Sequence, residues 1–368
     1  MKKPIETKRY FDTFDSMRFL AFFCVYLGHL PSLNIPFFDT FQHSSGLGVK
    51  FFFTLSGFLI TYLILDEKEK NGKLNLVHFF VRRILKIWPL YYLMILFAYC
   101  TPYIINMLGL SSSSLGYEPN WFLSVAFLEN YKMIIENQLP NVSPLGVMWS
   151  LCIEEHFYII WGIIFYYIKI EKTPYLIVVC IVVSWIAKFI YLQNGWNTID
   201  IFTNFDTFAY GAIPAFLLVK RKDNFEKSII SLPYFLKMGI ILFTILAVVF
   251  VHYLKEVIYI NEILFSNFFC ILFSIVIAFV VPGKNDIKIG KTNILSRLGK
   301  YTYGLYLYHT IVINLFIQIY TGNSLSLNSF SSSVLLFLLT LFVTVLVSIL
   351  SYYLFEVRFL RLKISFRP

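Results

Sequence analysis

The stretch Ser16-Met-Arg18-Phe-Leu-Ala-Phe-Phe-Cys-Val-Tyr-Leu-Gly-His29-Leu30 decides the fold, because it is apolar enough to enter a membrane and still carries two ionisable residues. Such residues are costly in lipid, so Arg18 and His29 each need a protein partner, water or a substrate. Eleven residues at about 100° each come to roughly 1100°, close to three full turns, so both side chains lie on one helix face about 16 Å apart. We interpret them as the two ends of one long binding slot. The alternative is that Arg18 snorkels to lipid headgroups and His29 caps a backbone carbonyl.

The composition of the chain indicates a polytopic membrane protein. Of its 368 residues, 58% are hydrophobic and only 14% are charged, whereas a soluble domain averages about 25% charged residues. The net charge of +10 does not indicate nucleic-acid binding, because the basic residues lie between apolar runs and form no single basic face. The five cysteines show neither CxxC nor metal-ligand spacing, so we predict no metal site.

Hydropathy predicts an all-α protein with about ten transmembrane helices. With both termini in the cytoplasm, the basic residues fall on the inner side except Lys50, Lys132, Lys188 and Lys255, which agrees with the positive-inside rule. No signal-peptide cleavage site follows the first apolar run, so we expect it to be retained as an anchor. We therefore expect an integral membrane protein. The predicted spans are 16–33, 46–65, 87–108, 149–168, 175–192, 203–219, 236–254, 262–281, 301–320 and 333–355.

A carboxylate partner for His29 is predicted on the fourth span, in Trp149-Ser-Leu-Cys-Ile-Glu154-Glu155-His-Phe-Tyr158. Glu154 lies about 8 Å below the outer boundary and His29 about 10 Å below it, so the two depths agree. A buried imidazole that is oriented by a carboxylate is the arrangement that general-base catalysis requires. The alternative is that Glu154, Glu155 and His156 only line an outer vestibule.

Basic residues just before the third span suggest an anion site on the inner side. The stretch His78-Phe-Phe-Val-Arg82-Arg83-Ile-Leu-Lys86-Ile-Trp-Pro-Leu-Tyr-Tyr92 places Arg83 and Lys86 on one helix face. Together with Arg18, these cations are suited to clamp the phosphates of an anionic cofactor. Topology alone also explains some cations at this position.

Three further polar residues lie within predicted spans. Asp206 is suited to cap its helix, which we favour, to pair with His29 or to bind an acceptor. His309 is predicted to lie mid-membrane and to face the bundle interior. The hydroxyl of Ser56 is an unfavourable nucleophile, because the sequence predicts no base beside it.

Six stretches in this order resemble the acyltransferase-3 family of integral membrane acyltransferases. They are Arg18 with ten residues before His29, Phe51-Phe-Phe-Thr-Leu-Ser-Gly-Phe-Leu-Ile60, Arg82-Arg-Ile-Leu-Lys86-Ile-Trp-Pro89, Trp149–Tyr158, Phe205-Asp206 with Gly211 and Ala215, and Tyr303–His309. Two departures are Lys86, where the family usually has Arg, and Glu356-Val357-Arg358, which lacks a following proline. The resemblance covers nearly the whole chain, so we expect residues 1–368 to form one membrane-embedded domain without a fused soluble domain.

The resemblance implies transfer of an acyl group, usually acetyl, from cytoplasmic acyl-CoA to a hydroxyl of a surface polysaccharide or its lipid-linked precursor. Acetyl-CoA would be a co-substrate, with no permanently bound cofactor, and membrane lipids would be the other partners. Direct attack on the thioester is favoured over an acyl-histidine intermediate.

The rival hypothesis is a transporter or flippase of a lipid-linked glycan. The sequence leaves open the acceptor sugar, the acyl chain and the oligomeric state. The implied roles are catalysis for His29 and Glu154, cofactor binding for Arg18, Arg82, Arg83 and Lys86, and substrate binding for Asp206, His309 and Glu155.

Overall fold

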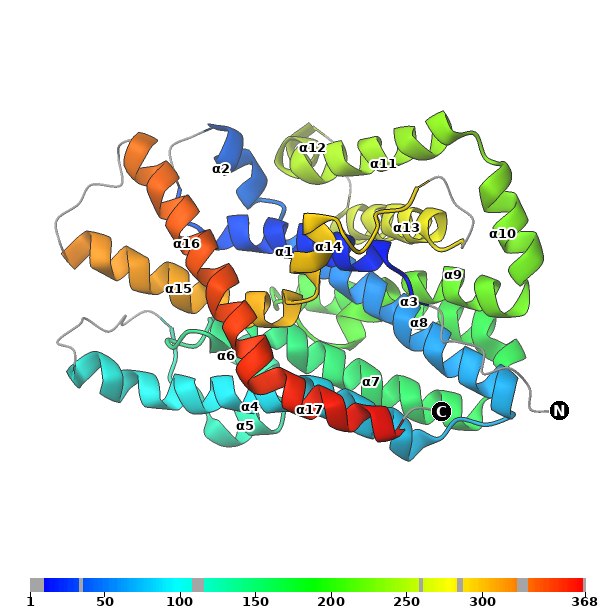
Figure 1. The fold of residues 1–368 in the computed structure, drawn as a ribbon, viewed down its shortest axis with the longest axis horizontal. Helices are drawn as coiled ribbons and strands as arrows, with labels where there is room; N and C mark the ends of the chain where they lie inside the picture. The colour runs from blue at the N-terminus through cyan, green and yellow to red at the C-terminus, as the bar shows by residue number, and fades with distance from the viewer. Residues whose placement is uncertain are drawn as a thin grey trace.

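The computed structural model describes residues 10–32, 36–107, 116–257, 261–282, 287–322 and 330–366. Within these ranges the protein is all-helical, and its only strand-like feature is an isolated bridge between Tyr117 and Pro140. Most of the long helices run roughly along one direction and form a bundle, which α16 crosses obliquely (Figure 1).

Each predicted span coincides with a long helix, although the bounds differ. The long helices are α1 (Thr13–His29), α3 (Ser45–Asn71), α4 (Leu76–Met107), α7 (Trp149–Tyr167), α8 (Thr173–Gln193), α9 (Phe205–Lys220), α11 (Tyr234–Val249), α13 (Glu262–Val280), α15 (Thr302–Gly322) and α16 (Phe330–Ser351). Short helices lie between them, namely α2 (Pro36–Gln42), α5 (Trp121–Val125), α6 (Glu129–Glu136), α10 (Lys222–Ser231), α12 (Val251–Val257) and α14 (Ile294–Gly299), and α17 (Val357–Leu362) follows α16.

Several of these helices have the length and apolarity of membrane spans. Among the described residues, 5 helices meet both criteria, or up to 6 if the pair α10 and α11, bent by 89°, is one broken span. The 5 are centred on α3, α4, α8, α13 and α16. Together with exposed leucine, isoleucine, valine and phenylalanine side chains along α8, α11 and α16, they identify an integral membrane protein. The full number of ten spans and the side of the termini stay predictions.

Two helix boundaries differ from the prediction in ways that matter for the site. α1 ends at His29, four residues early, because Leu30 precedes Pro31 and adopts an extended conformation with ψ 148°. α4 begins at Leu76, well before the predicted residue 87. Arg82, Arg83 and Lys86 therefore lie inside α4 and not just before it. Helical periodicity then fixes which of them share a face.

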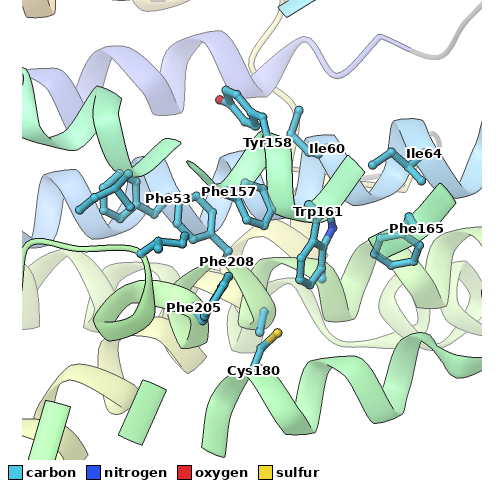
Figure 2. Close-up of a cluster of buried hydrophobic side chains, with 14 of the residues drawn as sticks. Phe53, Ile60, Ile64, Phe157, Tyr158, Trp161, Phe165, Cys180, Phe205 and Phe208 are labelled. Carbon is cyan, nitrogen blue, oxygen red and sulfur yellow. The ribbon is translucent and has the colours of Figure 1, made fainter. Parts of the chain in front are cut away.

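The core is built around α3 and α9. These helices pack closely because each carries a glycine that faces the backbone of the other helix. A Cβ atom on Gly57 would lie 2.1 Å from the carbonyl oxygen of Phe208, and one on Gly211 would lie 1.9 Å from that of Thr54. Small residues at such crossings let helix backbones approach in a membrane. Aromatic side chains fill the adjacent space, and the rings of Phe157 and Phe208 stack at 4.0 Å (Figure 2).

Gly211→Ala is expected to destabilise the protein, because the added methyl group meets backbone and not a flexible side chain. Overpacking of this kind costs about 1–3 kcal/mol. Thermal unfolding in detergent should show a lower midpoint for this variant. Gly239→Ala on α11 is the control, since nothing lies within 4 Å of its Cβ position. Equal midpoints for the two variants would contradict close packing of α3 against α9.

Candidate active site

α1 carries Arg18 in its second turn and His29 at its C-terminal residue. Nδ1 of His29 lies 2.8 Å from the carbonyl oxygen of Val25. A carbonyl only accepts, so Nδ1 carries the proton and donates it, which leaves the lone pair on Nε2. The His29 side chain also retains exposed surface. The backbone of α1 thus sets the tautomer that a general base acting through Nε2 needs.

A second histidine lies against His29. The ring centroids of His29 and His309 are 4.9 Å apart, with the planes at 83°. His309 is fully buried on α15, as predicted, and its Nδ1 donates to the carbonyl oxygen of Tyr306 at 2.6 Å. Its Nε2 has no hydrogen-bond partner within the part of the chain that the structure describes. In both imidazoles Nδ1 donates to a backbone carbonyl of the same helix, so Nε2 is the ring nitrogen left for other contacts.

Glu154 has partners other than the one the sequence predicted. Its Oε1 accepts a hydrogen bond from the Ser56 hydroxyl at 2.8 Å, and its Oε2 accepts one from the Tyr158 hydroxyl at 3.1 Å. No hydrogen bond between Glu154 and His29 occurs among the described contacts, and the partner of Nδ1 of His29 is the backbone carbonyl of Val25. The carboxylate also supplies the base beside Ser56 that sequence reasoning did not find.

The predicted cations of α4 form a cluster with Arg18 and Glu154. Lys86 lies within electrostatic range of Arg18, Arg83 and Glu154. The guanidinium of Arg83 lies 5.9 Å from the ring centroids of both Phe79 and Tyr158, and its Nε is buried without a hydrogen-bond partner in the described ranges. Arg18 donates to Asp15 on its own helix, which leaves further guanidinium donors for a ligand.

Arg82, by contrast, is engaged within the protein. Its side chain is buried, pairs with Glu67 at 3.0 Å and donates to the carbonyl oxygen of Phe366 at 2.7 Å. These contacts fasten the C-terminal segment, which runs beside α4 (Figure 1). The pattern favours a structural role for this arginine next to the cation cluster.

Arg82→Met is expected to destabilise the protein by about 3–5 kcal/mol, because it leaves the Glu67 carboxylate buried without its partner. The double variant Arg82→Met, Glu67→Met should recover part of this loss, since it removes both charges. Chemical denaturation in detergent measures the free energy of unfolding of the single and the double variant. Arg297→Met, which changes an exposed arginine, is the control. A single variant as stable as the unmodified chain would contradict a structural role.

The predicted substrate-binding carboxylates lie in two places. Asp206 is in the first turn of α9, but its carboxylate forms a buried ion pair with Lys188 of α8, so capping is not its main contact. Glu155 accepts from Trp88 Nε1 at 3.2 Å through Oε2, while Oε1 has no partner among the described residues.

Two of these partners differ in how far the sequence indicates them. Tyr158 lies one turn after Glu154 on the same helix, so its contact with Glu154 could be expected from the spacing. Nothing in the local sequence indicates Lys188 as the partner of Asp206.

Fold and site together define a class of protein: an integral membrane helical bundle with cations, a carboxylate and two imidazoles inside it. The sequence profile of an acyltransferase domain, that of the acyltransferase-3 family, matches residues 11–353. This chain belongs to the acyltransferase-3 family.

Similar proteins carry O-acetyltransferase names. The chain is 30% identical over 338 residues to the peptidoglycan O-acetyltransferase OatA of Listeria monocytogenes, a match covering 84% of this chain and 50% of that protein. It is 28% identical over 324 residues to the O-acetyltransferase OatA of Staphylococcus aureus, covering 83% of this chain and 51% of that protein. The chain therefore spans about half the length of these relatives. No solved structure matches it.

Proposed function

We propose that the protein is an acyl-CoA-dependent O-acetyltransferase of the bacterial cytoplasmic membrane. It takes an acetyl group from cytoplasmic acetyl-CoA and transfers it to a hydroxyl of a cell-wall glycan or its lipid-linked precursor. The family and the names of its relatives support acyl transfer to oxygen. The peptidoglycan named for the Listeria relative supports a cell-wall glycan as acceptor.

The donor would bind at the cation cluster formed by Arg18, Arg83 and Lys86. Like charges that lie together need a compensating anion, and the phosphates of acyl-CoA supply it. The partnerless Nε of Arg83 fits an incoming acceptor oxygen. Lys86 retains exposed surface although surrounding protein desolvates it, as expected of a side chain that lines an internal space. Arg82 holds the neighbouring turn in place through Glu67.

His29 would act as the general base at the other end of α1. Its Nε2 removes the proton from the acceptor hydroxyl as the hydroxyl oxygen attacks the thioester carbonyl carbon. The carbon–sulfur bond breaks, and the imidazolium returns the proton to the departing CoA thiolate. The products are an O-acetyl ester and free CoA, and His29 is again neutral. His309, which contacts His29, would hold the imidazole in place.

Glu154 would act on the donor side as a positioning residue. Its contacts with Ser56 and Tyr158, and its electrostatic interaction with Lys86, associate it with the cations. A carboxylate there offsets the repulsion between the ammonium group of Lys86 and the neighbouring guanidinium groups and so stabilises their arrangement. This role replaces the direct orientation of His29 that the sequence suggested.

The observation that carries the proposal is the continuity of α1, which holds Arg18 near the α4 cations and His29 at its opposite end. The separation of about 16 Å along a helix suits a donor with a long flexible arm. Mass spectrometry of cell-wall glycan from cells with and without the protein tests the function. We expect an acetyl-sized mass increase that depends on the protein. Identical spectra, together with sugar movement across proteoliposomes in the absence of acetyl-CoA, would favour a transporter instead.

A further inference from the structure

Three of the four basic residues that charge patterning assigns to the outer side gather at one place. Lys50 of α3, Lys188 of α8 and Lys255 of α12 surround the start of α13, whereas Lys132 lies apart on α6. Lys50 and Lys188 both donate to the hydroxyl of Ser266. The positive-inside rule disfavours lysines at this position, so their convergence needs a cause.

The charges of this cluster do not balance. Asp206 forms a buried ion pair with Lys188 and also accepts from the backbone N–H of Thr207. Lys50 has no such carboxylate partner among the described contacts and shares Ser266 with Lys188. Asp206 lies within electrostatic range of Lys50 but is already paired with Lys188, and a partly buried ammonium group without a counter-charge of its own is costly. An anion that enters beside Lys50 removes this cost.

A cavity of about 480 Å³ opens directly onto Lys50, a volume within the usual range of small-molecule sites. Lys255 and His43 add further positive or protonatable groups to its wall, and Asn261 and Ser266 add hydrogen-bonding groups. Its one lining carboxylate, Glu262, is exposed in the first turn of α13, where the helix dipole favours it. Leu47, Val251 and Phe265 provide apolar wall. The cavity thus suits a ligand that combines an anionic group with a larger body.

The cavity lies at the same end of the bundle as His29. Gly28, the residue before His29, packs directly against Ser45 at the start of α3. The first two turns of α3 also carry Gly46, Leu47 and Lys50, which line the cavity. α3 therefore lines the cavity and also contacts Gly28, which places the cavity beside the end of α1 that carries the proposed base.

We propose that this cavity binds an anionic group, carboxylate or phosphate, borne by the saccharide acceptor. This inference rests on the proposed function for the identity of the acceptor but not for the existence of the site. Lys50 makes the main ionic contact, and Lys255 contributes at the rim. The pair Lys188–Asp206 holds Ser266 and the end of α8 behind Lys50.

Binding is measured with the full chain in phosphatidylcholine nanodiscs, without acetyl-CoA. The probes are the disaccharide of N-acetylglucosamine and N-acetylmuramic acid, which carries a carboxylate, a farnesyl pyrophosphate-linked disaccharide, and neutral di-N-acetylchitobiose. We expect at least one anionic probe to bind about tenfold more tightly than the neutral one, as one ionic contact of about 1.4 kcal/mol gives. Lys50→Gln should abolish this preference and Lys255→Gln should reduce it. Lys132→Gln, which removes an outer lysine elsewhere, should leave it unchanged.

Several results would overturn the assignment of this cavity as a site for the anionic group of the acceptor. One is equal binding of all three probes, and another is an unchanged preference in a Lys50→Gln variant whose thermal midpoint matches the unmodified chain. Displacement of the saccharide by nanodiscs that contain anionic phospholipid would assign the cavity to a lipid headgroup instead. The anionic probe that binds identifies carboxylate or pyrophosphate as the recognised group. Lys50-dependent binding, with no acetyl transfer to the bound probe when acetyl-CoA is then added, would refute the proposed function and leave the site standing.

Discussion

His29→Gln is expected to lower kcat for acetyl transfer by about 10²–10⁴-fold, the range that loss of a general base produces. Glutamine has nearly the size of histidine and keeps a hydrogen-bond donor for the carbonyl of Val25, but its amide does not accept a proton. KM for acetyl-CoA should change little, because the cation cluster is untouched. Purified protein in proteoliposomes with radiolabelled acetyl-CoA and a glycan acceptor measures both constants.

The matched control is His78→Gln. This histidine lies near the start of α4 and packs against the ring of Phe366 at 5.6 Å, remote from His29 in the sequence and in its contacts. We expect its variant to transfer acetyl at the unmodified rate. His309→Gln should have an intermediate effect, since it removes a ring that contacts His29. Full activity of His29→Gln would exclude His29 as the base.

The double substitution Arg83→Gln, Lys86→Gln is expected to raise KM for acetyl-CoA by about 10²-fold or more, because hydrogen bonds to charged groups contribute about 1.5–3 kcal/mol each. A defect in donor binding should be overcome at high acetyl-CoA concentration, so kcat should fall much less than in His29→Gln. Initial rates over a range of acetyl-CoA concentrations give both constants. Lys73→Gln, an exposed residue between α3 and α4, is the control.

Glu154→Gln separates the two roles considered for this carboxylate. Its hydrogen bonds with Ser56 and Tyr158 associate it with the donor side, so KM for acetyl-CoA should rise with a smaller change in kcat. A loss of kcat equal to that of His29→Gln, with KM unchanged, would instead make Glu154 the direct partner of the base.

For the double variant of Arg83 and Lys86, an unchanged KM and kcat for acetyl-CoA would show that the cation cluster does not bind the donor.

Long apolar runs allowed the helices to be predicted from sequence, because in lipid a helix satisfies every backbone hydrogen bond within itself. The boundaries were less predictable. Pro31 ended α1 at His29 through its restriction on Leu30. The start of α4 was missed because Arg82, Arg83 and Lys86 lower hydropathy without interrupting a helix.

The candidate residues were recognisable from sequence as ionisable groups in apolar segments, but their partners were not. Glu154 and His29 have matching predicted depths, yet depth does not specify direction around a helix axis, and Glu154 contacts Ser56 of α3 instead. Likewise, Asp206 pairs with Lys188 across two helices. Such pairs depend on how helices rotate when they pack, which glycine contacts such as Gly211 against Thr54 determine.

The central claim is that the acetyl donor binds at one face of the membrane and the accepting hydroxyl is activated from the other. Sealed proteoliposomes with radiolabelled acetyl-CoA on one side and glycan on the other test it directly. We predict acetylated glycan only when acetyl-CoA faces the Arg83 side and the glycan faces the end that carries His29, with neither substrate crossing. Transfer that requires both substrates on the same side, or glycan that crosses without acetylation, would contradict the account.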